Sequence, residues 1–165
     1  MNIVAIDPGL SGAIAIIDHQ DGSIIDVFDM PIIAKTDKKN WINVPLLFDI
    51  LSTYYLDSYK QMVVIEQVHS MPKQGVSSVF SFGENLGAIR ATSICAGYSI
   101  EWVTPPKWKK HFNLLNKDKK MAGSVAVNLY SKDQHRFVGS RGGVLDGRSD
   151  AVLLARYIYD KELNK

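Results

Sequence analysis

The chain has 165 residues, of which 46% are hydrophobic, 22% charged and 10% aromatic, with a formal net charge of +2. These values predict a single globular domain spanning residues 1–165 and exclude the collagenous and disordered classes. No apolar run approaches the roughly 18 residues that cross a bilayer, and the first residues lack signal-peptide features, so we expect a soluble, cytoplasmic protein without membrane contact. The single cysteine, Cys95, has apolar neighbours, which predicts a buried thiol in a reducing compartment.

The first 28 residues predict three short strands. Apolar runs at 3–6, 12–18 and 24–28 are separated by Pro-Gly and Asp-Gly turn signals. Because connections this short join antiparallel neighbours, we expect a β-meander. A polar loop over 31–42 follows, and apolar residues at helical spacing then predict a helix that begins at Pro45.

Strands and helices alternate in the rest of the chain. The apolar run 62–66 predicts a strand buried on both faces, and a polar loop over 67–75 leads into a helix over about 77–96. A fifth strand over 100–103 stops at Pro105, and helical patterns cover about 118–130 and 149–163. This order predicts an α/β fold with a five-stranded mixed sheet, in which two strands run parallel to the first and helices cover both faces.

A stripe of small residues marks the helix predicted over about 77–96. Gly83, Gly87 and Ala91 lie four residues apart, so they share one face of the helix and allow close approach of another element. The pattern fits packing on the sheet, and it also fits a subunit interface.

Charge is distributed unevenly along the chain. Residues 1–57 carry a net charge of −5 and residues 58–165 a net charge of +7. The densest basic segment predicts either a surface that contacts phosphate groups or a solvated lysine-rich face. Its members are Lys107, Lys109, Lys110, Lys117, Lys119 and Lys120, offset only by Asp118. Trp108 and Phe112 interrupt this segment, and we expect them to anchor it to the core.

Two acidic residues end predicted strands. Asp7 closes the first strand and Glu66 the fourth. Open α/β sheets bind ligands at the carboxyl ends of their strands, and parallel neighbours would set these two carboxylates about one strand spacing, roughly 4.8 Å, apart. Carboxylates that close repel each other unless a cation lies between them. The pair therefore predicts a metal site.

Two further acidic residues begin the last predicted helix. Asp146 and Asp150 are four residues apart and so lie on one helix face, although Asp146 alone also fits a helix-capping role. Asp150 borders the apolar run 151–155, where an acid needs a partner. Four carboxylates without a His or Cys cluster favour two Mg²⁺ ions, with Mn²⁺ as a substitute, and two such ions can cleave a phosphodiester.

Three segments, in this order, resemble the RuvC family of Holliday junction resolvases. They are Ile6-Asp7-Pro8-Gly9-Leu10-Ser11-Gly12, Ile65-Glu66-Gln67-Val68 and Ser149-Asp150-Ala151. The resemblance covers nearly the whole chain and is greatest to the divergent versions carried by phages. It implies an RNase H-like fold, a homodimer, and Mg²⁺-dependent nicking of two strands across a four-way DNA junction, in the cytoplasm of a bacterial host if the chain is phage-encoded.

The resemblance also implies residue roles. It assigns metal binding to Asp7, Glu66, Asp146 and Asp150, and contacts with the scissile phosphate to Lys109 and Lys119. Cellular members space the two ligands of the last helix three apart, and that place is Gly147 here, which is a departure from the pattern.

A junction-opening loop follows Glu-Gln-Val in this family, and it carries an aromatic side chain where this chain has His69. Histidine stacks on bases and hydrogen-bonds them. The segment also fits an exposed polar loop without that role. Beyond the lysines, the residues predicted to contact DNA are His69, Met71, Lys73, Gln74, Arg141 and Arg148.

Three other functions fit parts of the pattern. An acidic strand end followed by Pro-Gly also occurs in actin-like kinases and ATPases, but those need a second lobe that 165 residues do not supply. A non-catalytic protein that binds branched DNA would not need all four acids. A nuclease acting on RNA–DNA hybrids is the remaining alternative, and the Glu-Gln-Val loop and lysine cluster favour the junction enzyme over it.

Overall fold

The computed structural model describes residues 2–34, 40–56, 61–69, 75–118, 120–139 and 142–163. Its centre is a five-stranded sheet with the strand order β3-β2-β1-β6-β7. The strands are β1 (Asn2–Asp7), β2 (Ala13–Asp18), β3 (Ile24–Asp29), β6 (Met62–Glu66) and β7 (Ser99–Val103). The first three pair antiparallel, and β6 and β7 run parallel to β1, as the turn signals and the alternation of elements predict.

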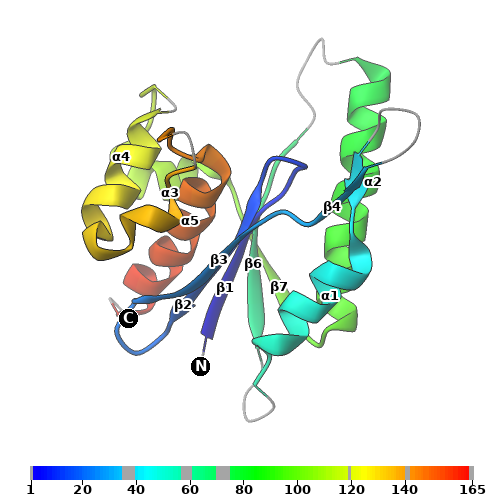
Figure 1. The fold of residues 1–165 in the computed structure, drawn as a ribbon, viewed down its shortest axis with the longest axis horizontal. Helices are drawn as coiled ribbons and strands as arrows, with labels where there is room; N and C mark the ends of the chain where they lie inside the picture. The colour runs from blue at the N-terminus through cyan, green and yellow to red at the C-terminus, as the bar shows by residue number, and fades with distance from the viewer. Residues whose placement is uncertain are drawn as a thin grey trace.

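Helices cover both faces of this sheet, as Figure 1 shows with the sheet edge-on between two helical layers. One layer holds α1 (Val44–Thr53) and α2 (Val76–Cys95). The other holds α3 (Pro105–His111), α4 (Lys120–Leu129) and α5 (Asp146–Leu163). No helix in the described ranges is long and apolar enough to cross a membrane.

The central strands divide their side chains between two hydrophobic cores. In β1, Ile3 and Ala5 pack with α5, whereas Val4 and Ile6 pack with α1 and α2. In β6, Val64 belongs to the α5 core. Successive side chains of a strand point to opposite faces, so a strand covered on both sides has to be apolar throughout. This explains the continuous apolar runs of the sequence.

The prediction of a polar loop over residues 31–42 is wrong in part. Residues Ile32–Ala34 (β4) and Asn40–Ile42 (β5) pair antiparallel as a separate two-stranded sheet. The side chain of Asn85 in α2 accepts a hydrogen bond from the backbone N–H of Ile42, a contact between distant parts of the chain that no local pattern signals.

Three further details differ from the prediction. Pro105 and Pro106 end the strand and also begin the short helix α3, since proline suits the first helical turn. A 3₁₀ helix, η1 (Ser131–Arg136), precedes α5. Cys95 is exposed at the end of α2, not buried, because Thr92 and Ser93 occupy the buried side of that turn and Cys95 lies on its exposed side.

Candidate active site

Strand alternation places two acids on the same face of the sheet. Asp7 has the parity of Ile3 and Ala5 in β1, and Glu66 has that of Val64 in β6, so both follow side chains that pack against α5. The parallel register pairs Ile6 with Ile65, one residue before each acid. Asp7 and Glu66 therefore lie at the carboxyl ends of neighbouring strands.

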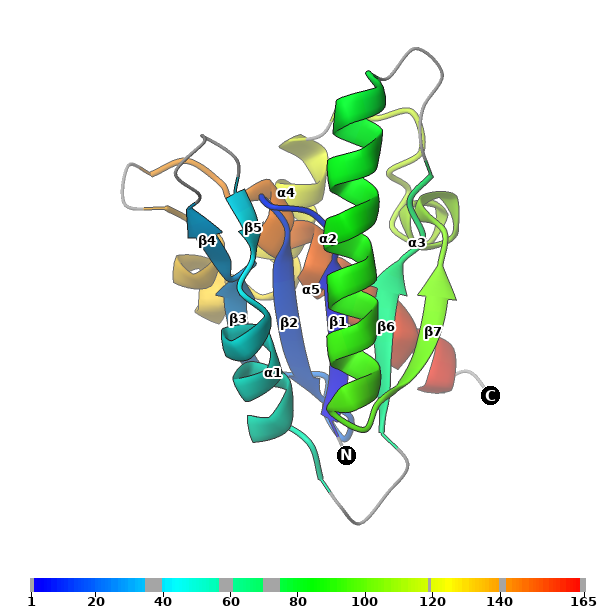
Figure 2. The same ribbon diagram turned by 90° about the vertical axis from the view of Figure 1, so that its right-hand side faces the viewer.

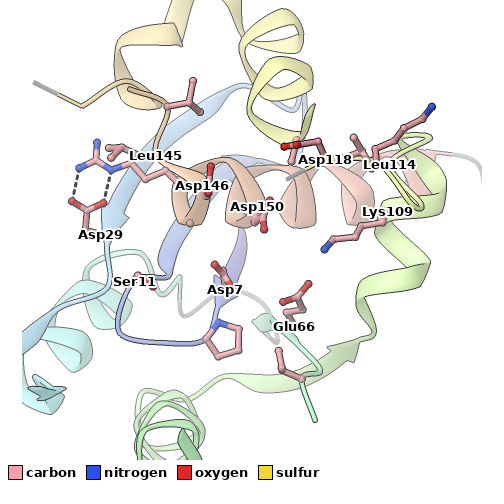
Figure 3. A pocket seen from close by; sticks show the side chains of 17 residues that line it. Asp7, Ser11, Asp29, Glu66, Lys109, Leu114, Asp118, Leu145, Asp146 and Asp150 are labelled. Atoms are coloured by element: carbon pink, nitrogen blue, oxygen red, sulfur yellow. Dashed lines mark hydrogen bonds and ion pairs between the residues drawn. The ribbon is translucent and has the colours of Figure 1, made fainter. Parts of the chain in front are cut away.

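Helix α5 brings two more acids over that edge. Residues 151–155 are buried against the sheet, which fixes the helix along its length. Asp150 is half-buried just before this run, and Asp146 is exposed in the first turn. Figure 3 shows Asp7, Glu66 and Asp150 pointing into one space from β1, β6 and α5.

The departure from the family pattern at Gly147 has a steric reason. A Cβ at this position would collide with the carbonyl oxygen of Ser11 and with the backbone of Gly12 in the turn between β1 and β2. The first turn of α5 therefore lies directly against that turn, and no side chain fits at position 147. An acid in the first turn of α5 therefore has to stand at another position, and Asp146, which begins this turn, lines the site.

The four acids line one cleft with a volume of about 590 Å³. Its other charged side chains are Asp29, Lys109, Lys117, Asp118 and Arg148. Among the described residues of the lining, six carboxylates and three basic groups give a formal net charge of −3. Such a lining attracts cations and repels phosphate groups.

The oxygen donors of this cleft fit a hard divalent cation such as Mg²⁺, because carboxylates suit such ions and the described residues of the lining include no His or Cys. Within the described ranges, no three His, Cys, Asp or Glu side chains stand as a group that could hold a metal ion. The donor chemistry of the cleft fits the metal.

Glu66 is held by a tryptophan. The Trp108 side chain is 0% exposed, and its Nε1 donates a 2.7 Å hydrogen bond to Oε1 of Glu66, which is itself buried. Trp108 anchors its segment to the core, as predicted. The contact with Glu66 was not predicted, because it joins residues 42 positions apart.

Arg148 and Asp29 form an ion pair at the rim of the cleft (Figure 3). Nε and Nη2 of Arg148 donate to the two carboxylate oxygens of Asp29 at 2.6 and 2.8 Å, and Nη1 donates to the carbonyl of Arg136. These hydrogen bonds from Arg148 lower the pKa of Asp29. Arg148, predicted to contact DNA, is thus also engaged in tying α5 to β3.

The predicted lysines divide into two groups. Lys109 is half-buried and lines the cleft together with the exposed Lys117. Lys107, Lys110 and Lys120 are exposed outside the lining.

His69 does not line the acidic cleft. It is exposed and lines an adjoining groove of about 360 Å³ together with Gly83, Gly87, Arg90 and Trp102, and Val68 lines both the groove and the cleft. The remaining predicted site residues, Met71, Lys73, Gln74, Lys119 and Arg141, lie outside the described residues.

Sequence reasoning missed two acids of the cleft. Asp29 ends β3, and Asp118 lies just before α4, where its Oδ1 accepts the backbone N–H of Lys120. The position of Asp29 at a strand end was a usable signal, since Asp7 and Glu66 were identified by the same criterion.

Comparison with solved structures assigns the fold. The matching solved structures include two of Thermus thermophilus RuvC, one of the protein itself and one in complex with a Holliday junction substrate. Each is 12% identical to this chain and covers 99% of it, with 97% and 96% of the RuvC chains covered and TM-scores of 0.58 and 0.60. No protein-family model and no curated protein matches the sequence. The chain thus has the RNase H-like fold of RuvC.

Proposed function

We propose that this chain is a divalent-metal-dependent endonuclease that resolves Holliday junctions and related branched DNA by paired nicking. The observation that carries the proposal is the convergence of carboxylates from β1, β6 and α5 on one cleft of an RNase H-like fold. The fold alone does not select a reaction, so the argument depends on the chemistry of the cleft.

The charge of the cleft favours a metal-dependent reaction. A DNA phosphate entering a lining with a formal net charge of −3 is repelled unless cations offset the carboxylates. Asp7, Glu66, Asp146 and Asp150 would hold Mg²⁺, or Mn²⁺ in its place. When bound, two such ions supply Lewis acids that activate a water and stabilise the leaving oxygen of a phosphodiester.

The lysines would orient the DNA. Lys109 and Lys117 line the cleft and would contact the scissile phosphate or its neighbours, while Lys107, Lys110 and Lys120 extend a basic surface beyond it. Lysine contacts of this kind supply affinity without sequence preference and weaken with salt. Lys119, His69, Met71, Lys73, Gln74, Arg141 and Arg148 stay predicted DNA contacts. The relation to phage-carried versions also stays a prediction.

Branched DNA is the proposed substrate because one matching structure is described as RuvC in complex with a Holliday junction substrate, and because the sequence carries the Glu-Gln-Val segment. Paired nicking of a symmetric junction needs two active sites related by symmetry. We therefore propose a homodimer.

The outward face of α2 is the proposed dimer interface. Val76, Phe80 and Ile94 are 86%, 67% and 54% exposed, and they share one helix face with the exposed Gly83 and Gly87. Figure 2 shows the first turns of α2 extending beyond the ends of β6 and β7. An apolar stripe with small residues at its centre fits the same stripe of a second copy.

The test is a panel of labelled DNA substrates incubated with Mg²⁺: a four-way junction, a three-way junction, a fork, a linear duplex and an RNA–DNA hybrid. We expect paired nicks in the four-way junction and none in the linear duplex. In Asp7→Asn, cleavage should be lost while junction binding persists, because losing a metal ligand affects the transition state more than the phosphate contacts.

The outcomes separate the alternatives. Cleavage of the hybrid alone would show the RNase H-type activity instead. Binding of the junction without cleavage by any metal tested would show a non-catalytic branched-DNA-binding protein. Normal cleavage by Asp7→Asn would refute the assignment of the metal site.

A further inference from the structure

Trp108 contacts two charged side chains of the cleft. Its indole N–H donates to Oε1 of Glu66 at 2.7 Å, and Nζ of Lys109 lies 5.2 Å from the centre of its ring. Both partners line the cleft, whereas the ring itself is fully buried. One core side chain is thus in contact with an acid and a base of the candidate active site.

The backbone holds this ring in place. Val103 of β7 pairs with Glu66 of β6, and the carbonyl of Val103 accepts a hydrogen bond from the N–H of Gln67. Helix α3 begins at Pro105, two residues after that pair, so Trp108 is carried back toward Glu66 within its first turns. Its ring packs in the same core as α5. The donor therefore comes from a rigid part of the fold.

Core packing alone does not require the N–H group. A phenylalanine or leucine would fill an apolar site without a polar atom, whereas a buried indole N–H costs free energy unless it is paired. An indole has a single donor, and here that donor faces a carboxylate of the cleft and not a backbone carbonyl. The hydrogen bond to Glu66, and not core packing, therefore accounts for the N–H group of Trp108.

We propose that Trp108 is a positioning residue. Its N–H fixes one oxygen of Glu66 and leaves the other oxygen directed to a divalent cation, and its ring face guides the ammonium group of Lys109 toward the cleft. Groups that hydrogen-bond a metal-ligating side chain orient it and tune its affinity for the metal. The inference rests on the proposed metal-dependent function.

The first test uses the unmodified chain. Labelling the tryptophans with ¹⁵N gives three indole signals in an NMR spectrum, from Trp41, Trp102 and Trp108. Addition of Mg²⁺ should shift the Trp108 signal and leave the Trp102 signal in place, since Trp108 donates to Glu66 whereas Trp102 lines the adjoining groove and not the acidic cleft. The Trp108 signal is assigned by its loss in Trp108→Phe, and Glu66→Gln should shift it without any metal.

The second test measures Mg²⁺ affinity by calorimetry without DNA. Trp108→Phe should weaken binding about tenfold, the lower end of the loss seen when a partner of a metal ligand is removed. Trp102→Phe is the matched control and should leave affinity unchanged. If Trp108→Phe fails to fold, replacement of Trp108 by 3-benzothienylalanine keeps the bicyclic ring shape, puts a sulfur atom in place of the donating N–H, and should give the same loss.

The results distinguish this inference from the proposed function. One outcome would overturn the positioning role and leave the metal site standing. In it, Asp7→Asn abolishes Mg²⁺ binding, but Mg²⁺ does not shift the Trp108 signal and the Trp108 variants bind Mg²⁺ with unchanged affinity. Absence of Mg²⁺ binding together with absence of junction cleavage would refute the proposed function, and the positioning role with it.

Discussion

The two long helices on opposite faces of the sheet are attached to it in different ways. Helix α5 buries eight of its 18 residues, and most of them are apolar. Helix α2 buries four of its 20 residues, and of these only Ile89 is apolar. Apolar burial is the main stabilising contribution to packing, so α5 is fixed on the sheet more firmly than α2.

The buried polar side chains of α2 donate their hydrogen bonds within the same helix. Asn85, Thr92 and Ser93 each donate a side-chain hydrogen bond to the carbonyl four residues earlier in the same helix. Such bonds prevent unpaired polar groups but add little attachment to the sheet. The firmly packed helix carries two acids of the cleft, Asp146 and Asp150, and the loosely packed one leaves an apolar face exposed. This difference agrees with the proposal that α5 contributes to the reaction and α2 to the dimer interface.

The largest expected difference between the helices is in cleavage. Asp150→Asn in α5 should reduce junction cleavage at least about a hundredfold, because a metal supplies several kcal/mol of transition-state stabilisation. Glu84→Gln removes an acid from α2 and should leave the rate unchanged. Single-turnover cleavage of a labelled four-way junction measures both. Equal effects would show that α5 has no special role in the reaction.

Glycine-to-alanine substitutions should have opposite effects on stability. Gly147→Ala in α5 forces a Cβ against the backbone of Ser11 and Gly12, and overpacking of this kind costs about 1–3 kcal/mol. Gly87→Ala in α2 places its Cβ in open space, so the better helix propensity of alanine should stabilise the fold by about 0.5–1 kcal/mol. Urea unfolding at a concentration that keeps the chain monomeric measures both. A neutral Gly147→Ala would contradict the close contact between α5 and the β1–β2 turn.

The sequence predicted the sheet, and the position of two acids at one edge of it, because both depend on strand periodicity. Apolar runs and short turns predicted the antiparallel meander, and alternation of strands with helices predicted the two parallel strands. Since parallel strands end at one edge, Asp7 and Glu66 could be brought together from sequence alone. Helical spacing likewise predicted that Asp146 and Asp150 share a face.

Contacts between distant segments could not be predicted. The Trp108–Glu66 hydrogen bond and the Arg148–Asp29 ion pair depend on how α3 and α5 dock on the sheet. The close approach of Gly147 to the β1–β2 turn depends on the same docking. From the sequence alone, the glycine at this position was therefore interpreted as a departure from the pattern, and the contact that requires it was not predicted. The pairing of β4 with β5 is held partly by Asn85 of α2, far along the chain.

The next prediction concerns assembly. Gly83→Leu combined with Gly87→Leu should weaken dimerisation at least about tenfold, since bulky side chains prevent close approach of two α2 helices and even 1.4 kcal/mol of overpacking has this effect. Neither Cβ would have an atom of the described residues outside α2 within 4 Å, so the fold should be retained. Ser78→Leu adds an exposed leucine to the opposite side of α2 and serves as the control. Unchanged sedimentation of the double variant would place the dimer interface elsewhere.

The smallest expected effect on stability concerns the first turns of α5 and α2, which are stabilised differently. Arg148 ties α5 to Asp29, whereas α2 begins after Gly75 without a side-chain cap. Arg148→Gln should lower the free energy of unfolding by about 0.5 kcal/mol at neutral pH, because Asp29 is largely exposed and solvent screens the pair.

The loss caused by Arg148→Gln should depend on pH in a definite direction. Hydrogen bonds from Arg148 lower the pKa of Asp29 in the folded state, so their stabilising contribution is present above the ordinary aspartate pKa and is lost as pH falls through the lowered value. Wild type and variant should therefore converge in urea unfolding as pH decreases from about 6 to about 3. Gly75→Ser, which adds a cap of a few tenths of a kcal/mol to α2, should show no such dependence. A constant difference across this range would show that Arg148 stabilises α5 through its bond to the carbonyl of Arg136, and not through Asp29.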